Sequence, residues 1–245
     1  MFIRKVDFMQ RILSPMKKAI KEFQLIEEGD RIGVGVSGGK DSMVLLKALK
    51  LYQQFSPINF ELEAFTIDLG FEGFDTESIK NYCESLDVPF NLKETHIKKV
   101  VFDIRKEKNP CSLCANMRRG ALNSHLKDKG FNKLALGHHS DDAIETLFLS
   151  MLYEGRLRTL PPKSFLTRKE IYVIRPFIYL YEEEITKAVN RENIPISKNP
   201  CYVDKETKRE EIRILLNSIY SEIPGSRKRI FRALQNKDEL RLLLN

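Results

Sequence analysis

The spacing of hydrophobic residues predicts short buried strands that alternate with amphipathic helices along most of the chain. Apolar runs predict strands at residues 31–36, 61–68, 90–95, 133–137 and 171–175. Apolar positions three and four residues apart predict helices at 43–55, 76–86, 115–129 and 142–153. Elements in this order form a parallel sheet with helices on both faces. The expected fold is α/β, with a doubly wound parallel sheet of about five strands.

Both ends of the chain have a more helical pattern than the centre. Residues 1–28 have apolar positions at helical spacing, and Ser14-Pro15 predicts a second helix start, because Ser caps helices and Pro fits their first position. Residues 181–245 are mostly helical and basic. We expect N-terminal helices at 1–28, an α/β domain with a C-x-x-C pair at 29–180, and a basic helical region with a third cysteine at 181–245.

Composition and charge exclude some classes of protein. The 245 residues are 42% hydrophobic and 31% charged, which is typical of a globular chain. No apolar run approaches the roughly 18 residues of a membrane span, and the first residues lack a signal-peptide pattern, so we expect no membrane association and a cytoplasmic location. The 41 Lys and Arg outnumber the 34 Asp and Glu, and this net charge of +7 favours a polyanionic partner.

The loop after the first strand has the chemistry of a phosphate site. Its sequence is Ser37-Gly38-Gly39-Lys40-Asp41-Ser42, between a predicted strand and a helix. Glycines let backbone N–H groups approach phosphate oxygens, and the helix N-terminus adds a positive dipole end. Lys40 would add a charge, the hydroxyls would donate hydrogen bonds, and Asp41 would hold Mg²⁺ or orient the loop. A capped glycine turn without a ligand is the alternative.

A second polar loop follows the fourth predicted strand, at the same edge of the sheet. In Gly137-His138-His139-Ser140-Asp141-Asp142, clustered His and Asp side chains lead into a predicted helix, and Asp141 would cap that helix. A metal-hydrolase site is less favoured, because no third spaced His follows. Asp68, at the end of the second strand, is either near an adenosine or a turn residue.

Three of the four cysteines have positions suited to chemistry. Cys111 and Cys114 open a predicted helix, near two arginines that favour thiolates, and Cys201 follows a proline in a loop. Cys83 has the spacing of a helix core face. Three thiolates suit a [4Fe–4S] cluster with one iron open to a further ligand. Persulfide chemistry by the C-x-x-C pair, a zinc ion, or three unrelated cysteines are the alternatives.

As a set, these motifs resemble the tRNA 2-thiocytidine synthetase group of PP-loop ATP pyrophosphatases. The resemblance extends over about residues 30–201 and includes S-G-G-K-D-S, the C-x-x-C with two following arginines, the run from Gly137 to Leu149, and Pro200-Cys201. It implies a PP-loop fold and an ATP-dependent tRNA sulfurtransferase. Such an enzyme adenylates cytidine O2, at position 32 of tRNA, and replaces that oxygen with sulfur.

The resemblance also implies cofactors and a set of site residues. The cofactors are ATP, Mg²⁺ and a [4Fe–4S] cluster on Cys111, Cys114 and Cys201, which together with Asp41 are the expected catalytic residues. The residues expected to bind ATP are Ser37, Gly38, Gly39, Lys40, Asp41, Ser42, Asp68, Gly137, His138, Asp141 and Asp142.

The expected partners are tRNA, a sulfur donor such as a cysteine desulfurase, and a second copy of the chain. Basic residues expected on the RNA backbone are Arg118, Arg119, Lys208, Arg209, Arg213, Arg227, Lys228 and Arg229. A solvated helical face is the alternative for this basic region. Three other functions stay open: a lysidine-synthetase-like enzyme, iron-free uridine thiolation by persulfide, and a non-enzymatic ATP- and RNA-binding redox sensor.

Overall fold

The computed structural model describes residues 2–106, 110–197, 200–201 and 208–236, and the chain divides into two compact units. The sheet unit comprises Met1–His139 and Pro161–Asp204, and the helical unit comprises Ser140–Leu160 and Lys205–Asn245. No helix in the described part of the chain is long and apolar enough to cross a membrane. The domain limits expected at residues 28 and 180 stay a prediction.

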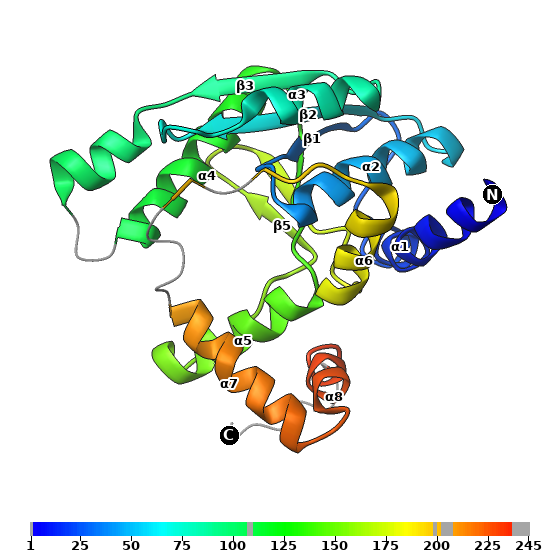
Figure 1. The fold of residues 1–245 in the computed structure, drawn as a ribbon, viewed down its shortest axis with the longest axis vertical. Coiled ribbons are helices and arrows are strands. Elements are labelled where there is room, and N and C mark those ends of the chain that lie inside the picture. The colour runs from blue at the N-terminus through cyan, green and yellow to red at the C-terminus, as the bar shows by residue number, and fades with distance from the viewer. Residues whose placement is uncertain (1, 107–109, 198–199, 202–207, 237–245) are drawn as a thin grey trace. The chain divides into compact units, whose positions relative to one another are not determined.

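The sheet unit is built on six strands in the order β3-β2-β1-β4-β6-β5 (Figure 1). The strands are β1 (Arg31–Gly35), β2 (Glu61–Asp68), β3 (Phe90–Glu94), β4 (Lys133–Ala135), β5 (Lys163–Leu166) and β6 (Ile171–Ile174). All neighbouring pairs are parallel except β5 with β6. The expected α/β fold with a mostly parallel sheet is confirmed, and β5 is one strand more than expected.

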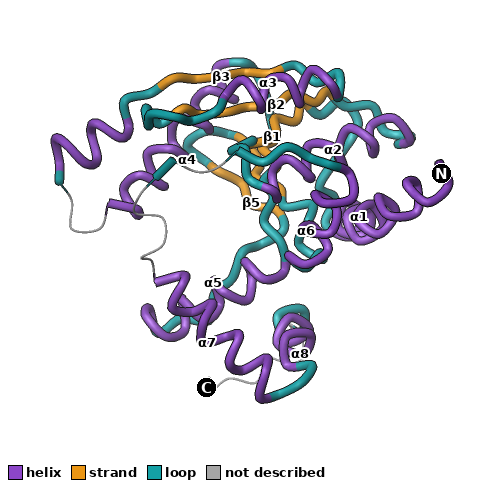
Figure 2. The backbone as a smooth tube through the Cα atoms, in the orientation of Figure 1, coloured by secondary structure: helices purple, strands orange, loops and turns teal. Residues whose placement is uncertain are grey.

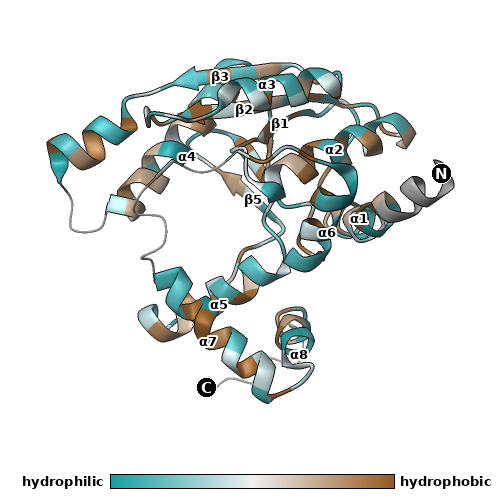
Figure 3. Cartoon of the chain, in the orientation of Figure 1, coloured by the Kyte–Doolittle hydropathy of each residue, from teal (hydrophilic) through white to brown (hydrophobic). Residues whose placement is uncertain are grey.

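Helices cover the sheet and position the loops at its carboxyl edge. The helices of this unit are α1 (Phe2–Glu22), α2 (Lys40–Phe55), α3 (Thr76–Ser85), the π-helix η1 (Lys99–Arg105), α4 (Pro110–Asp128) and α6 (Glu182–Glu192). Helix α4 packs on one face through a core cluster of Phe65, Leu126, Phe131, Leu134 and Val173. Helix α2 is amphipathic and buries Val44, Leu45, Leu46, Ala48 and Leu49 (Figure 3).

The N-terminal segment forms one helix rather than the two predicted. Helix α1 runs through Pro15 and ends at Glu22. A proline inside a helix costs about 3 kcal/mol, because it removes one N–H and crowds a carbonyl. Here an apolar stripe continues on both sides of Pro15, and Ile12, Met16 and Ala19 are fully buried. We attribute the uninterrupted helix to the burial of this stripe, which outweighs the local cost.

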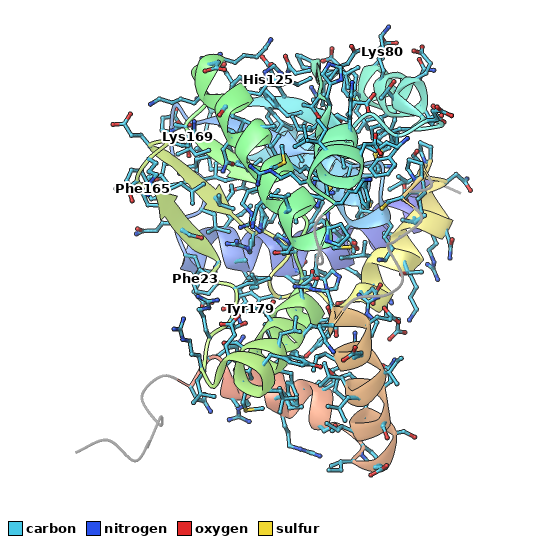
Figure 4. All side chains as sticks on the ribbon, turned by 90° about the vertical axis from the view of Figure 1, so that its left-hand side faces the viewer. Phe23, Lys80, His125, Phe165, Lys169 and Tyr179 are labelled. Atoms are coloured by element: carbon cyan, nitrogen blue, oxygen red, sulfur yellow. The ribbon has the colours of Figure 1, made fainter. Side chains whose placement is uncertain are left out.

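Strand β5 forms an antiparallel hairpin with β6 at the edge of the sheet. Phe165 pairs in register with Tyr172, and their rings lie 4.8 Å apart. Figure 4 shows Phe165 on this outer edge, with Lys169 in the same region. The hairpin turn ends at Glu170, whose φ of 51° is a left-handed conformation, and β6 begins at the next residue.

A buried ion group joins the amino-terminal ends of β1 and β4. Lys133 is 1% exposed, and its ammonium lies 2.6 Å from Asp30 and 2.8 Å from Glu27. Its hydrogen bond and charge hold the pKa of Glu27 below the ordinary value. Buried charges persist only when they are paired, so this group stabilises the edge of the sheet opposite to the polar loops.

The helical unit contains α5 (Ser140–Glu154), α7 (Lys208–Glu222) and α8 (Ser226–Ala233). Its core consists of the buried Ile144, Ile212 and Leu216, with partly buried aromatic residues against them. Figure 2 shows these segments as helices, whereas the strands all belong to the sheet unit. The expected helical character of the basic C-terminal region is confirmed for its described residues.

Candidate nucleotide and cysteine site

The loop between β1 and α2 is shaped by its own side chains. The Ser42 hydroxyl donates to the Gly39 carbonyl at 2.9 Å and accepts from the Ser37 N–H at 3.2 Å. Gly38 has a φ of 78°, which favours glycine. The loop therefore has a fixed turn at the N-terminus of α2, where the helix dipole favours an anion.

The end of β4 lies directly against this phosphate loop. A Cβ on Gly137 would lie 2.8 Å from the carbonyl carbon of Asp41 and 3.1 Å from the backbone nitrogen of Ser42. His139 is buried, with its Nε2 3.8 Å from the Asp41 carboxylate. Thus the structure brings Gly137 and His139 to the first polar loop, and His138 is half-buried.

Lys40 is held by two carboxylates. Its ammonium lies 2.8 Å from Glu182, the first residue of α6, and 3.3 Å from Asp41. Burial lowers the pKa of Lys40, but the hydrogen bonds and charges of Glu182 and Asp41 raise it above its ordinary value. Lys40 is therefore protonated at neutral pH, as a lysine that binds phosphate must be.

The segment that leads to Cys201 packs on the phosphate loop. The Ser197 N–H donates to the Gly38 carbonyl at 3.0 Å. A Cβ on Gly38 would lie 2.7 Å from the Ser197 Cβ, so only glycine permits this approach. Cys201 is four residues further along, a span of at most about 14 Å. The late cysteine is therefore tethered close to the loop.

The three cysteines of interest lie near one another in the sheet unit. Cys111 and Cys114 are half-buried in the first turn of α4, and Cys201 is half-buried. Burial raises the pKa of Cys114, Arg118 opposes this rise, and the charges of Cys201 and Cys111 add to it. A charge effect between these thiols requires them to be neighbours.

The chemistry of these donors suits an iron–sulfur cluster. Cysteine thiolates are the protein ligands of [4Fe–4S] clusters, and three of them leave one iron open to a further ligand. Three half-buried thiols beside an arginine therefore fit the cluster that the sequence implies.

Thiol reactivity should separate Cys83 from the other three cysteines. Cys83 is fully buried, and burial raises its pKa to about 12. At pH 8 in the metal-free protein, we expect a thiol reagent such as iodoacetamide to label Cys111, Cys114 and Cys201 and to leave Cys83 unmodified until the protein is unfolded. Peptide mass spectrometry with and without denaturant measures this, and rapid native labelling of Cys83 would contradict it.

Asp68 has the geometry of a turn residue. Its carboxylate accepts from the Gly70 N–H at 2.7 Å, and its carbonyl accepts from the Thr95 hydroxyl at 2.7 Å. These two bonds fix the loop after β2, and the first of them gives the Asp68 side chain a structural role in the turn. A contact with adenosine stays a prediction.

The acidic residues at the start of α5 pair with arginines of α7 and α8 inside the helical unit. Arg227 donates to Asp141 at 2.5 Å, and Arg209 lies 3.1 Å from Asp142. Glu145 is 4% exposed and contacts Arg213 at 3.0 Å and Arg209 at 3.3 Å. Three of the predicted RNA-binding arginines are thus partly buried against carboxylates, and this pairing stabilises the packing of the three helices.

The exposed basic residues differ from these three arginines. Arg118, Arg119, Lys228 and Arg229 are exposed, and Lys208 is exposed while bonded to Glu211 at 2.9 Å. Arg229 also donates to the Pro224 carbonyl. The prediction of RNA contacts therefore rests chiefly on exposed cations of α4 and α8.

Three residues that contact the loop were not predicted from the sequence. Glu182 binds Lys40, Ser197 binds Gly38, and His139 faces Asp41. Glu182 and Ser197 lie more than 140 positions from their partners, so no local motif joins them. His139 belongs to the Gly137–Asp142 loop. The sequence does not show which of its two adjacent histidines lies beside Asp41, because that depends on how the chain turns after β4.

Comparisons with known proteins agree with this geometry. A PP-loop domain model matches residues 9–219. A tRNA-cytidine(32) 2-sulfurtransferase of Pelobacter propionicus is 37% identical over 244 residues, which cover 98% of this chain and 91% of that protein. Its counterpart from Vibrio vulnificus is 40% identical over 229 residues, which cover 93% and 74% of the two chains.

A solved structure supports the fold. The U34-tRNA thiolase NcsA from Methanococcus maripaludis, solved with its [4Fe–4S] cluster, superposes with a TM-score of 0.75 and 23% identity. The match covers 94% of this chain and 78% of that one. The extent of the PP-loop match, together with the identity to the curated relatives, shows that the chain belongs to the PP-loop family, in the group of the tRNA-cytidine(32) 2-sulfurtransferases.

Proposed function

We propose that this protein is an ATP-dependent tRNA sulfurtransferase that converts a cytidine, at position 32 of tRNA, to 2-thiocytidine. The observation that carries the proposal is the tether between the phosphate loop and the cysteines: Gly38 accepts a hydrogen bond from Ser197, four residues before Cys201. A site that activates a base and a site that delivers sulfur must be near each other for the second nucleophile to reach the activated carbon.

The loop residues have distinct roles in the activation step. The cytidine O2 attacks the α-phosphorus of ATP, the bond to the β-phosphate breaks, and pyrophosphate leaves with the electron pair. Lys40 and the amides of the glycine turn stabilise the charge that develops on the leaving group. Asp41 would hold Mg²⁺, and the buried His139 ring lies 3.8 Å from its carboxylate. Displacement of AMP by sulfur at C2 completes the exchange.

Cys111, Cys114 and Cys201 would hold a [4Fe–4S] cluster, and their neighbouring, half-buried thiols support this assignment. When bound by three thiolates, such a cluster leaves one iron free for a sulfur ligand. Arg118 adds a positive charge beside Cys114, which favours the thiolate form that binds metal. A lysidine synthetase needs no such cysteines, so their grouping disfavours that alternative.

Exposed cations are available for RNA on each of the two units. Arg118 and Arg119 follow the cysteines on α4 of the sheet unit, and Lys228 is exposed on α8 of the helical unit. Such residues bind the phosphate backbone, while the modified base must come from an unstacked loop to reach the chemistry. Cytoplasmic location, a sulfur donor of the cysteine desulfurase type and a homodimer complete the proposal.

Nucleoside analysis of tRNA tests the proposed reaction. In a strain that lacks this gene, we expect 2-thiocytidine to be absent from total tRNA and to return with the wild-type gene but not with an Asp41→Ala variant. Asp41→Ala should retain iron, because the loop and the thiols are separate ligand sets. Liquid chromatography with mass spectrometry measures the nucleosides. Loss of a thiouridine or of lysidine instead would assign a different base and contradict the proposal.

A further inference from the structure

Glu182 is a carboxylate in a place where a phosphate loop has no evident use for one. It forms the shorter of the two ion pairs of Lys40, at 2.8 Å against 3.3 Å for Asp41. The side chains of Lys40 and Glu182 are 28% and 34% exposed, so the pair lies at the surface of the site and a ligand can reach it. Lys40, the lysine expected to bind phosphate, is thus paired with Glu182, which is negatively charged as phosphate is.

The backbone fixes the position of this competitor. Glu182 is the first residue of α6, and Glu184 closes a capping box with Tyr181 through a 3.0 Å bond. At the last residue of α6, Glu192 pairs with Lys47 in the middle of α2 at 2.8 Å. Because α6 packs along α2 and is also held to it by the Lys47–Glu192 pair, the Glu182 carboxylate stays beside the loop when Lys40 turns away from it.

Lys40, in contrast, can change partners by rotation of its own side chain. Its four-carbon stem is flexible and its ammonium has three donors, so it can leave one carboxylate for a phosphate oxygen without backbone movement. A doubly charged phosphate oxygen group attracts the ammonium more strongly than a single carboxylate. When pyrophosphate departs, the nearest anion is again Glu182.

We propose that Glu182 is the exchange partner of Lys40: it holds the lysine when no nucleotide is bound, yields it to the phosphates of ATP, and takes it back as pyrophosphate leaves. This inference rests on the proposed function of the loop and adds a residue that sets how tightly the loop binds and how readily it releases its product. Glu182 acts through Lys40 and is therefore a positioning residue.

The test is direct binding to the full-length protein by isothermal titration calorimetry, with ATP·Mg²⁺ and with inorganic pyrophosphate. Glu182→Gln removes the competing charge, and we expect both ligands to bind about three- to fivefold more tightly, the factor that a partly exposed ion pair supplies. In steady-state assays the KM for ATP should fall and pyrophosphate should inhibit more strongly, while kcat does not rise.

Two matched variants separate exchange from a structural role. Glu192→Gln breaks the second ion pair between α6 and α2, at the last residue of α6, and its ATP affinity should equal that of the wild type. Glu182→Asp retains a carboxylate and should bind ATP within about twofold of the wild type. Equal or weaker ATP binding by Glu182→Gln would overturn the inference while leaving the proposed function intact; a wild-type protein that binds no ATP would overturn both.

Discussion

Replacing Cys201 by alanine is expected to remove the iron cluster and abolish thiolation while leaving ATP binding unchanged. The two remaining thiols lie within one turn of α4, and two ligands from one turn cannot retain a cluster that needs three. Iron per chain should fall from about four to near zero. Iron analysis after anaerobic reconstitution, combined with calorimetry for ATP, measures both outcomes separately.

Cys83→Ala is the matched control for this prediction. Cys83 is fully buried in the core face of α3, so its replacement should cost stability through a small cavity and retain iron. Iron retained by the Cys201 variant would contradict the ligand set. Iron lost from the Cys83 variant without unfolding would show that the assignment of the core cysteine is wrong.

Most of the sheet could be predicted because the signal is local. Each parallel strand is a run of apolar residues followed by a helix of regular spacing, and this order specifies the fold class. Strand β5 is different, since Lys163 and Ser164 carry no strand pattern and the segment becomes a strand only by pairing with β6. The helix break expected at Pro15 is absent for the same reason, because burial in the folded chain outweighs the local preference of proline to end a helix.

The site divides in the same way between local and distant information. The phosphate loop and the C-x-x-C are contiguous motifs, so their chemistry can be predicted from the sequence. The partners of Lys40 and Gly38 are Glu182 and Ser197, which only the folded chain brings to the loop. A basic residue in the sequence also does not identify an RNA contact by itself. Arg213 is basic, but its guanidinium pairs with Glu145 inside the helical unit.

Gly137→Ala is expected to weaken ATP binding by about tenfold or more, through contact with the phosphate loop rather than through any lost functional group. The added Cβ would meet backbone atoms of Asp41 at 2.8 and 2.9 Å, and backbone at the start of a helix cannot yield as a flexible side chain can. Relief of this overlap must shift Asp41 and Ser42, and a shift there moves both the carboxylate that we propose holds Mg²⁺ and the hydroxyl that shapes the turn. Calorimetry with ATP·Mg²⁺ measures the effect.

A second glycine in the same unit provides the control. Gly120 lies in α4, and a Cβ placed there meets no atom within 4 Å, so Gly120→Ala should leave ATP affinity unchanged and stabilise the helix by up to about 1 kcal/mol. Iron content should be equal in both variants, because neither substitution touches a thiol. If Gly137→Ala bound ATP as the wild type does, the end of β4 would not restrain the loop. The proposal that the two polar loops form one site would then be wrong.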